Sequence, residues 1–383
     1  MVTGAYYPEI SGAGFQCRTL VGALRDLVTF TVLTTTIDRS LPVADDVDGI
    51  PTYRVPIKPG SIWSQLNAAA RFTWWFARLR RRFEVVHLHG FSRKTLLVIL
   101  LARCFRKRII QKLTSAGHDD PLGIRNRGWL SYRLYKSADR FLAPSPRLAD
   151  LYQTSRLPAE RLREVPNGVD TDRFRPPTQG ERIAIRRALG LPQEAFLILF
   201  VGFFSHEKRP DALFAAWKRA RKAEATPSGV VFVGATRSRY YEVDAAMADE
   251  IRREAQELGI EKDLRFIEQT LEIDRYYRAV DCFVLPSTRE GLPNVLLEAM
   301  ASGLPCLATC LKRITDCLIV HGENGFLFPS GDLEAMSSLL VQLMRDPELR
   351  KRVGERARKT VLERFSIGAT ARRVLQIYQE LRS

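Results

Sequence analysis

Two glutamates eight positions apart, Glu290 and Glu298, flank a short segment that contains glycine and proline. The surrounding residues predict a strand over 282–285, a loop, a helix over 294–302 and a second strand over 305–308. In this arrangement Glu290 projects from the loop and Glu298 lies one turn into the helix. Backbone N–H groups at a helix start lack intrahelical partners and favour an anion such as phosphate. Two carboxylates beside such a turn suit a sugar nucleotide, whose hydroxyls donate to the acids and whose diphosphate accepts from the amides.

The loop between the two acids is shaped by glycine and proline. Gly291 and Pro293 keep the chain out of a helix, and Pro293 also suits a first helical turn, where no backbone donor is needed. The amides expected to meet a phosphate belong to one run of residues: Gly291, Leu292, Pro293 and Asn294. The pattern therefore predicts a pocket for a sugar nucleotide.

A longer stretch of sequence around the two glutamates resembles the pattern of a known protein family. From Ser287 onwards the sequence reads S-x-x-E-G-L-P-N-x-x-L-E-A-M-A-x-G-x-P, which resembles the retaining, nucleotide-sugar-dependent glycosyltransferases of family 4. The resemblance covers nearly the whole chain and is strongest over residues 162–330. It implies an α/β protein of the GT-B fold, with two Rossmann-like domains facing a central cleft. It also implies that Glu298 binds ribose hydroxyls and that Glu290 acts at the donor sugar.

A second part of the resemblance lies in LILFVGFFSHEKRP, where Lys208 follows a buried strand. The family pattern there is V-G-R-x-x-x-E-K-G, and its arginine and lysine hold the donor diphosphate. Lys208 matches, whereas Phe203 replaces the arginine and Arg209 replaces the glycine. A lysine ammonium stabilises a departing diphosphate without a metal. We expect Lys208 to act in catalysis and Arg209 to serve as a substitute cation at the donor. Phe203 is the departure from the family pattern that bears on whether the protein is catalytically competent.

The first half of the chain contributes a glycine turn and a histidine. Gly12 and Gly14 follow the first expected strand and let the backbone approach a ligand, although a tight connection without a ligand has the same pattern. The resemblance implies that this loop contacts donor phosphate or acceptor. His118 follows the strand expected over 108–113, near the place of a family histidine that contacts the donor sugar. Thr114 fits that place equally well.

The remaining acids and histidines indicate no metal. Asp119 and Asp120 are expected to be loop acids or helix caps, and His87 and His89 are expected in the core, although one or both could face the cleft. The histidines have no carboxylate or thiol at metal-ligand spacing. We therefore expect a metal-free site with no cofactor, whose substrate is a UDP-, GDP- or other nucleotide sugar.

Length and composition agree with a two-domain globular protein. The chain has 383 residues, of which 45% are hydrophobic, and its formal net charge is +16. That charge attracts nucleic acid, anionic membranes or phosphorylated ligands without selecting among them. The six cysteines have no C-x-x-C spacing, which fits a reducing compartment. The N-terminus lacks a secretory pattern and the longest apolar run, Thr95–Ala102, is too short for a bilayer span, so a cytoplasmic location is expected.

Strands and helices alternate in two halves, which predicts parallel sheets with covered faces. The expected strands are 29–34, 85–89, 108–113 and 140–143 in the first half and 197–203, 230–234, 264–267, 282–286 and 305–308 in the second. The expected helices are 15–26, 64–82, 93–105, 125–137 and 146–154, then 210–223, 241–258, 274–279, 294–302 and 332–344, with further helix towards residue 381.

The domain boundary is expected near 165–177, where VPNGVDTDRFRPP combines Asn-Gly with three prolines and resembles the family's interdomain pattern P-N-G-V-D-x-x-x-F. We expect an N-terminal acceptor domain over residues 1–166, onto which a C-terminal helix, 366–383, packs back. The nucleotide-sugar donor domain is expected over residues 167–365. Only Met1–Gly4 precede the glycine turn, so either the first strand is abbreviated or the true start of the chain lies upstream.

Basic and aromatic residues gather in RFTWWFARLRRRF, residues 71–83. As a helix, this segment has an apolar face and places most of its arginines opposite. The apolar face comprises Phe72, Trp75, Phe76, Leu79 and Phe83. The pattern is typical of a helix that lies on anionic lipid, and also of a Rossmann helix packed on its own sheet. A peripheral position on the inner face of a membrane is thus an expectation, while nucleic acid is not an expected partner, because no recognition module is present.

These observations lead to one hypothesis and its alternatives. The hypothesis is retaining transfer of a hexose-type sugar from a nucleotide diphosphate to a glycan, lipid-linked or other hydroxyl acceptor. One alternative, favoured by Phe203, is a GT-B nucleotide-sugar-binding protein with little or no catalysis. The other is a sugar-nucleotide epimerase or a phosphorylase, and a phosphorylase would need a pyridoxal-binding lysine context that the sequence does not show.

Overall fold

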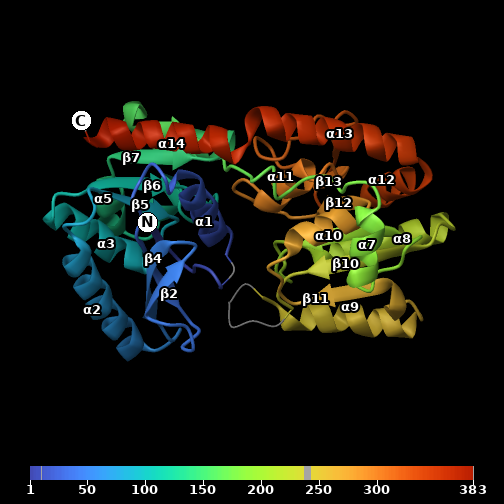
Figure 1. Cartoon of the computed structure of the whole chain (residues 1–383), viewed down its shortest axis with the longest axis horizontal. Coiled ribbons are helices and arrows are strands. Elements are labelled where there is room, and N and C mark those ends of the chain that lie inside the picture. The colour runs from blue at the N-terminus through green and yellow to red at the C-terminus, as the bar shows by residue number, and fades with distance from the viewer. Residues whose placement is uncertain (10, 237–242, 383) are drawn as a thin grey trace. The chain divides into compact units, whose positions relative to one another are not determined.

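The computed structural model describes residues 1–9, 11–236 and 243–382 and divides the chain into two compact units (Figure 1). Unit 1 comprises Met1–Gly168 and Ile367–Ser383, and unit 2 comprises Val169–Ser366. Each unit is a mainly parallel sheet with helices on both faces, which confirms the α/β class that the alternating pattern predicted.

Unit 1 contains an eight-stranded sheet in the order β3-β4-β2-β1-β5-β6-β7-β8. Neighbouring strands are parallel except β3 and β4, which are antiparallel. The strand order reverses between β1 and β5, so this is the topological switch point of the sheet. The strands are β1 (Val2–Thr3), β2 (Val32–Thr36), β3 (Ala44–Val47), β4 (Ile50–Pro56), β5 (Val85–His89), β6 (Arg108–Lys112), β7 (Arg140–Ala143) and β8 (Leu162–Glu164).

Two apolar clusters cover the two faces of the unit 1 sheet. One includes Phe72, Ile99 and Phe141 and lies under α2, α3 and α4 to α6, while the other lies under α1 and α14 and includes Leu20 and Tyr378. The helices are α1 (Gly12–Leu24), α2 (Ile62–Leu79), α3 (Arg93–Cys104), α4 (Pro121–Arg125), α5 (Trp129–Tyr135), α6 (Pro146–Thr154) and α14 (Ile367–Arg382), with a 3-10 turn η1 (Ala159–Arg161). The final helix α14 contacts α1, and α2 contacts α3 (Figure 1).

Unit 2 contains a six-stranded, fully parallel sheet in the order β11-β10-β9-β12-β13-β14, whose switch point lies between β9 and β12. The strands are β9 (Phe196–Val201), β10 (Ser228–Val233), β11 (Leu264–Ile267), β12 (Cys282–Leu285), β13 (Cys306–Thr309) and β14 (Phe326–Phe328). The helices are α7 (Glu181–Ala188), α8 (Pro210–Ala223), α9 (Ala245–Glu257), α10 (Ile273–Ala279), α11 (Asn294–Ala301), α12 (Leu333–Arg345) and α13 (Pro347–Arg364), with a 3-10 turn η2 (Glu261–Asp263).

Some elements differ from the sequence-based expectation. The pair β3 and β4 was not predicted, and α7 was also missed. The helix expected over 125–137 is instead α4 and α5, because Gly128 adopts a φ of 108° between them. The first residues of the helix expected over 241–258 lie outside the described part of the chain, and α9 begins at Ala245. None of the described helices combines the length and the apolar composition required to cross a bilayer.

Candidate functional site

The switch point of unit 2 brings together the two loops that the sequence singled out. Strand β9 ends at Val201 and leads into the loop of Lys208, and β12 ends at Leu285 and leads into the loop of Glu290. These strands are parallel neighbours, so their carboxyl ends lie at the same edge of the sheet. In open parallel sheets, ligands bind at this edge and at the switch point.

Direct contacts join the two loops. The Lys208 Nζ donates to Glu290 Oε1 at 2.7 Å, and the Thr288 N–H donates to the Glu207 carbonyl at 2.8 Å. The Arg289 guanidinium forms an ion pair with the Glu207 carboxylate. The structure therefore unites Lys208 and Glu290, which are 82 positions apart, in one ion pair.

The surroundings of this ion pair protect it from solvent. Glu290 is only 8% exposed, and the Lys208 side chain is 28% exposed. The Lys208 N–H donates to the Ser205 carbonyl at 3.0 Å, which holds the loop in a turn. A partly buried pair of this kind is screened much less by salt than an exposed one.

The second glutamate lies in a different environment. Glu298, on α11, is 5% exposed and accepts a hydrogen bond from the Tyr277 hydroxyl at 3.0 Å. Burial raises the pKa of Glu298 to about 7, against the opposing effects of the Tyr277 hydrogen bond and of Arg173. Its carboxyl group is therefore divided between neutral and charged forms near neutral pH, and a ligand that donates hydrogen bonds favours the charged form.

The segment between the glutamates leads directly into α11. Gly291, Leu292 and Pro293 are buried and Asn294 is half-buried. Pro293 is the N-cap residue and provides no side-chain hydrogen bond to the first turn. The start of α11 thus lacks the side-chain cap that serine, threonine or aspartate provides at other helix starts.

Arg209, the first residue beyond Lys208, has a strained backbone. Its φ is 54°, in the left-handed region that favours glycine, which accounts for a glycine at this position in the family pattern. Its guanidinium contacts the Asp211 carboxylate at 3.0 Å. Phe203, earlier on the same loop, is half-buried. The two loops carry one more arginine, Arg289, which the sequence did not point to as a candidate.

The remaining candidates belong to unit 1. Helix α1 starts at Gly12, and Ser11 caps it by accepting from the Gly14 N–H at 3.0 Å. A Cβ on Gly14 would lie 2.2 Å from the Ala5 carbonyl oxygen, so this glycine permits α1 to approach the chain that follows β1. The contact gives Gly14 a structural purpose that involves no ligand.

His118 lies in a turn stabilised by the two acids that follow it. Asp119 accepts from the N–H groups of Thr114 and Ser115, and Asp120 caps α4. These contacts confirm the expectation that both acids are structural. His118 is half-buried, and its carbonyl accepts from Arg127 at 2.7 Å.

Two further histidines, His87 and His89, lie side by side in the interior of unit 1. His87 and His89 are 1% and 4% exposed, as expected for core residues, and His87 Nδ1 lies 2.7 Å from the Tyr378 hydroxyl. In the described part of the chain, no group of three or more His, Cys, Asp or Glu residues is arranged to hold a metal ion.

Comparison with known families identifies both units. A model described as "Glycosyl transferase 4-like domain" matches residues 11–168, and one described as "Glycosyl transferases group 1" matches residues 181–360. The chain belongs to the family 4 glycosyltransferases, and its two Rossmann-like units form the GT-B fold. It is accordingly a glycosyltransferase.

Individual relatives agree with this assignment. EpsD of Bacillus subtilis is 28% identical over 88% of this chain and 86% of its own length. The D-inositol 3-phosphate glycosyltransferase of Corynebacterium urealyticum is 31% identical over 58% of this chain and 51% of its own. The Escherichia coli UDP-Gal:alpha-D-GlcNAc-diphosphoundecaprenol alpha-1,3-galactosyltransferase is 26% identical over 58% and 54%. The last two alignments thus span about half of those relatives.

A solved structure has the same fold. HepE of Anabaena, crystallised with UDP and glucose, superposes with a TM-score of 0.79 over 99% of this chain and 98% of its own, at 18% identity.

Proposed function

We propose that this chain is a retaining glycosyltransferase that moves a hexose-type sugar from a nucleotide diphosphate to a hydroxyl group. The observation that carries the proposal is the ion pair between Lys208 and Glu290, which joins the two loops at the switch point of unit 2. A cation suited to a diphosphate beside a carboxylate suited to sugar hydroxyls supports the proposal. Unit 2 is then the donor domain and unit 1 the acceptor domain.

Each group has a distinct task in this proposal. Glu298 accepts hydrogen bonds from the ribose hydroxyls, and Glu290 accepts them from the donor sugar. Lys208 and the amides at the start of α11 stabilise the charge that develops on the departing diphosphate. The Lys208 ammonium supplies this charge stabilisation without a metal ion or other cofactor.

The acceptor attacks the anomeric carbon of the donor sugar on the same face from which the leaving group departs, so the configuration at that carbon is retained. The acceptor oxygen forms its bond to the anomeric carbon while the bond from that carbon to the phosphate oxygen breaks. The acceptor's proton passes to that phosphate oxygen, so the diphosphate serves as leaving group and as base. The reaction yields the glycoside and a nucleoside diphosphate.

Phe203 stands where the family pattern has a second cation, and this residue favours a nucleotide-sugar-binding protein with little catalysis as the second candidate. Two other arginines are close in sequence to Lys208 and Glu290. Arg209 is paired with Asp211, and Arg289 with Glu207. We assign the missing charge to Arg289, because it precedes Glu290 directly and its partner Glu207 precedes Lys208.

Named relatives support the substrate classes. HepE was crystallised with UDP and glucose, and the Escherichia coli relative is named for transfer from UDP-Gal to a diphosphoundecaprenol-linked sugar. A nucleotide-sugar donor and a lipid-linked glycan acceptor are therefore the substrates we propose for this chain.

The decisive experiment is a donor screen with membrane extract as acceptor source. UDP- and GDP-sugars are titrated by calorimetry, and products are followed by mass spectrometry. Glu290→Ala should lower turnover by about a hundredfold or more, as loss of a transition-state contact does. Glu254→Ala is the control, because Glu254 is an exposed residue of α9 that pairs with Lys218 and not with Lys208 or Glu290. Donor binding without transfer or hydrolysis would favour the binding protein, and unchanged turnover in Glu290→Ala would remove that residue from the site.

We also propose a peripheral association with the inner face of an anionic membrane, through a surface that differs from the one expected. Phe72, Phe76 and Leu79 of α2 lie in the core, so the apolar face identified in the sequence is not available to lipid. The exposed side of α2 instead presents Trp63, which is 79% exposed, and Trp74, which is 55% exposed.

Charge complements these exposed tryptophans. Residues 58–138 include 17 lysines and arginines but only three acids, Glu84, Asp119 and Asp120, and the two aspartates are buried. Trp129 and Leu130 of α5 are also exposed, and α3 contacts both α2 and α5. Tryptophan with arginine is the composition of helices that lie in a lipid interface.

Cosedimentation with phosphatidylglycerol vesicles tests this surface. The double variant Trp63→Ala, Trp74→Ala should weaken binding about tenfold, because two amphipathic rings no longer enter the interface. Leu258→Ala, at an exposed apolar residue of unit 2, is the control. Equal binding of the two variants, or equal binding to neutral vesicles, would contradict a membrane role for α2.

A further inference from the structure

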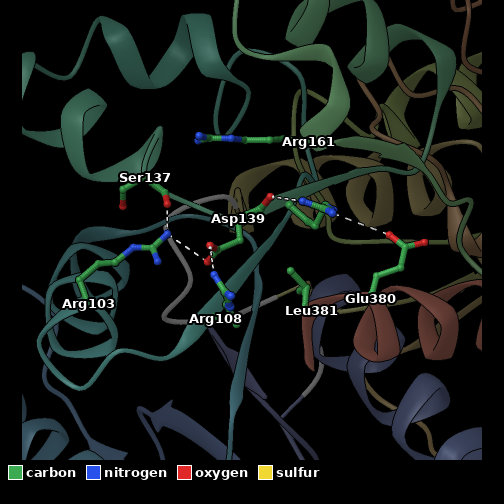
Figure 2. Close-up of a pocket in the computed structure, with 8 residues that line it drawn as sticks. Arg103, Arg108, Ser137, Asp139, Arg161, Glu380 and Leu381 are labelled. Carbon is green, nitrogen blue, oxygen red and sulfur yellow. Dashed lines mark hydrogen bonds and ion pairs between the residues drawn. The ribbon is translucent and has the colours of Figure 1, made fainter. Parts of the chain in front are cut away.

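A pocket rich in arginine lies at the amino ends of the unit 1 strands. It has a volume of about 300 Å³. The lining comprises Arg103, Arg108, Ser137, Asp139, Arg140, Arg161, Glu380 and Leu381 (Figure 2). Arg108 and Arg140 are the first residues of β6 and β7, and Arg161 directly precedes β8. The pocket is thus at the opposite end of the strands from the carboxyl edge, where parallel sheets bind their usual ligands.

The two acids of the pocket are already shared among arginines. Arg103 lies 3.0 Å and Arg108 lies 3.5 Å from the carboxylate of Asp139, and Figure 2 shows both converging on it. Glu380 lies 3.8 Å from Arg140 and 3.2 Å from Arg163, which is outside the lining. Four lining guanidinium groups therefore face two carboxylates.

Arg161 has no carboxylate partner among the described residues. Its guanidinium donates to the carbonyls of Lys136 and Ala138, at 3.1 and 3.5 Å, and Figure 2 draws no contact between it and the other lining residues. Arg140 has a further unused donor, because its Nε is buried without a hydrogen-bond partner in the described part of the chain. A buried donor without a partner is costly in a folded protein.

A purely structural explanation accounts for only part of this arrangement. Arg103 is in the last turn of α3 and donates to the Ser137 carbonyl, and arginines often stabilise carbonyls at helix ends. Carbonyl groups carry no net charge, however, so they leave the excess of positive charge in the pocket unbalanced. An anion with two negative charges would balance it.

We propose that this pocket binds a small anion that carries a phosphate or diphosphate group. Guanidinium groups offer paired N–H donors that match phosphate oxygens, and they stay charged at every physiological pH. The volume accommodates a ligand of that size. The site does not depend on the transfer reaction proposed above, because all of its residues lie in unit 1 and away from the glycine turn at the carboxyl edge.

Calorimetric titration with inorganic pyrophosphate tests the pocket. Because Lys208 is expected to bind a diphosphate as well, the titration is made on the full chain with Lys208→Ala, which should retain this binding. Adding Arg161→Gln should lower the affinity at least tenfold, and adding Arg108→Gln should lower it several-fold. Arg253→Gln, whose side chain is 71% exposed on α9, is the matched control.

Thermal unfolding without ligand checks that each variant is folded. The Arg108 side chain is 56% exposed, so its replacement leaves the fold intact and tests the pocket even if Arg161→Gln unfolds. Affinity that is unchanged in both arginine variants, or absent in the Lys208→Ala chain, would overturn the proposal.

Phosphatidylglycerol vesicles distinguish a lipid headgroup from a free phosphate compound. If the pocket takes lipid phosphate, pyrophosphate displaces the chain from vesicles and Arg161→Gln weakens vesicle binding. If the pocket takes a soluble ligand, vesicle binding is the same with and without Arg161, while pyrophosphate binding still depends on it. Either result supports a phosphate site at this position.

Discussion

Glu290 and Glu298 have the same side chain and lie on one short segment, but their surroundings differ. Glu290 is on the loop after β12 and is held by the Lys208 ammonium at 2.7 Å. Glu298 is inside α11, where its carboxylate accepts a hydrogen bond from the neutral Tyr277 hydroxyl at 3.0 Å. Burial without a directly paired cation raises the pKa of Glu298 to about 7.

The difference shows how environment assigns two tasks to one residue type. A carboxylate fixed by a lysine has a position that depends on that lysine, so Glu290 and Lys208 should behave as a unit. A carboxyl group with a pKa near neutrality has a charge that depends on pH and on its ligand, so Glu298 should report on ribose binding. Variants of Lys208, Glu290 and Glu298 separate these two behaviours.

The largest effect is expected from breaking the ion pair. Lys208→Ala leaves the Glu290 charge nearly buried and unpaired, and it removes the cation proposed for the leaving group, so turnover should fall about a hundred- to a thousandfold. Steady-state rates with UDP- and GDP-sugars measure this loss. Lys218→Ala is the matched control, because Lys218 also pairs with a glutamate, Glu254, in unit 2.

The double variant then tests whether the pair acts as a unit. If Lys208 and Glu290 work together, Lys208→Ala combined with Glu290→Ala should be little slower than either single variant. Independent roles would instead give multiplied losses, and a loss in Lys218→Ala equal to that in Lys208→Ala would assign the effect to general destabilisation.

The contiguous features of the donor region could be predicted from the sequence. The apolar run 282–285 correctly predicted β12, and Gly291, Pro293 and the apolar residues that follow them correctly predicted the loop and α11. The partners of the glutamates could not be predicted, since Tyr277 is 21 positions from Glu298 and no short pattern links them. The Lys208 loop lies beside the Glu290 loop because β9 and β12 are neighbours in the sheet. That strand order is a property of the whole fold and not of either local segment.

Features that are assembled from distant segments of the chain were the hardest to predict from the sequence. The arginine pocket draws on α3, β6, β7, η1 and α14, which no single stretch of sequence connects. The helix α2 shows a different difficulty, because its aromatic pattern fitted both a lipid face and a core face. Packing decides between them, and the structure places Phe72 and Phe76 in the core.

An intermediate effect is expected at Glu298. Ribose hydroxyls donate to its carboxylate, so the affinity of the protein for the nucleotide should rise about tenfold between pH 6 and pH 8 as Glu298 ionises. Glu298→Gln should remove most of this rise, and calorimetry at several pH values measures it. Glu254→Gln, at an exposed carboxylate, should keep the wild-type profile, and a flat wild-type profile would exclude ribose contact by the Glu298 carboxylate.

The same residue gives a stability test without ligand. The pKa of Glu298 is raised from 4.5 to about 7, so folding favours its protonated form. Its contribution to the free energy of unfolding is therefore complete below pH 4.5 and lost as the pH rises to about 7, by roughly 3 kcal/mol. Urea unfolding should show a smaller decline with pH in Glu298→Gln than in the wild type.

The smallest effect is expected at the residue that carries the chain from Lys208 into α8. Arg209 adopts a φ of 54°, which costs a non-glycine residue about 1 kcal/mol, and Arg209→Gly removes that cost. Arg209→Ala loses the same guanidinium and its contact with Asp211 but keeps the strain, so it is the matched control. Urea unfolding should find the glycine variant more stable than the alanine variant by up to about 1 kcal/mol, since the greater freedom of glycine in the unfolded chain offsets part of the gain. Because the missing charge is assigned to Arg289, both variants should keep most of the wild-type turnover, and an equal loss in both would show that the Arg209 charge acts at the donor. An alanine variant as stable as the glycine variant would show that the backbone at Arg209 is not strained. A larger loss of turnover in the glycine variant than in the alanine variant would show that the rigid backbone at Arg209 helps to hold Lys208 against Glu290.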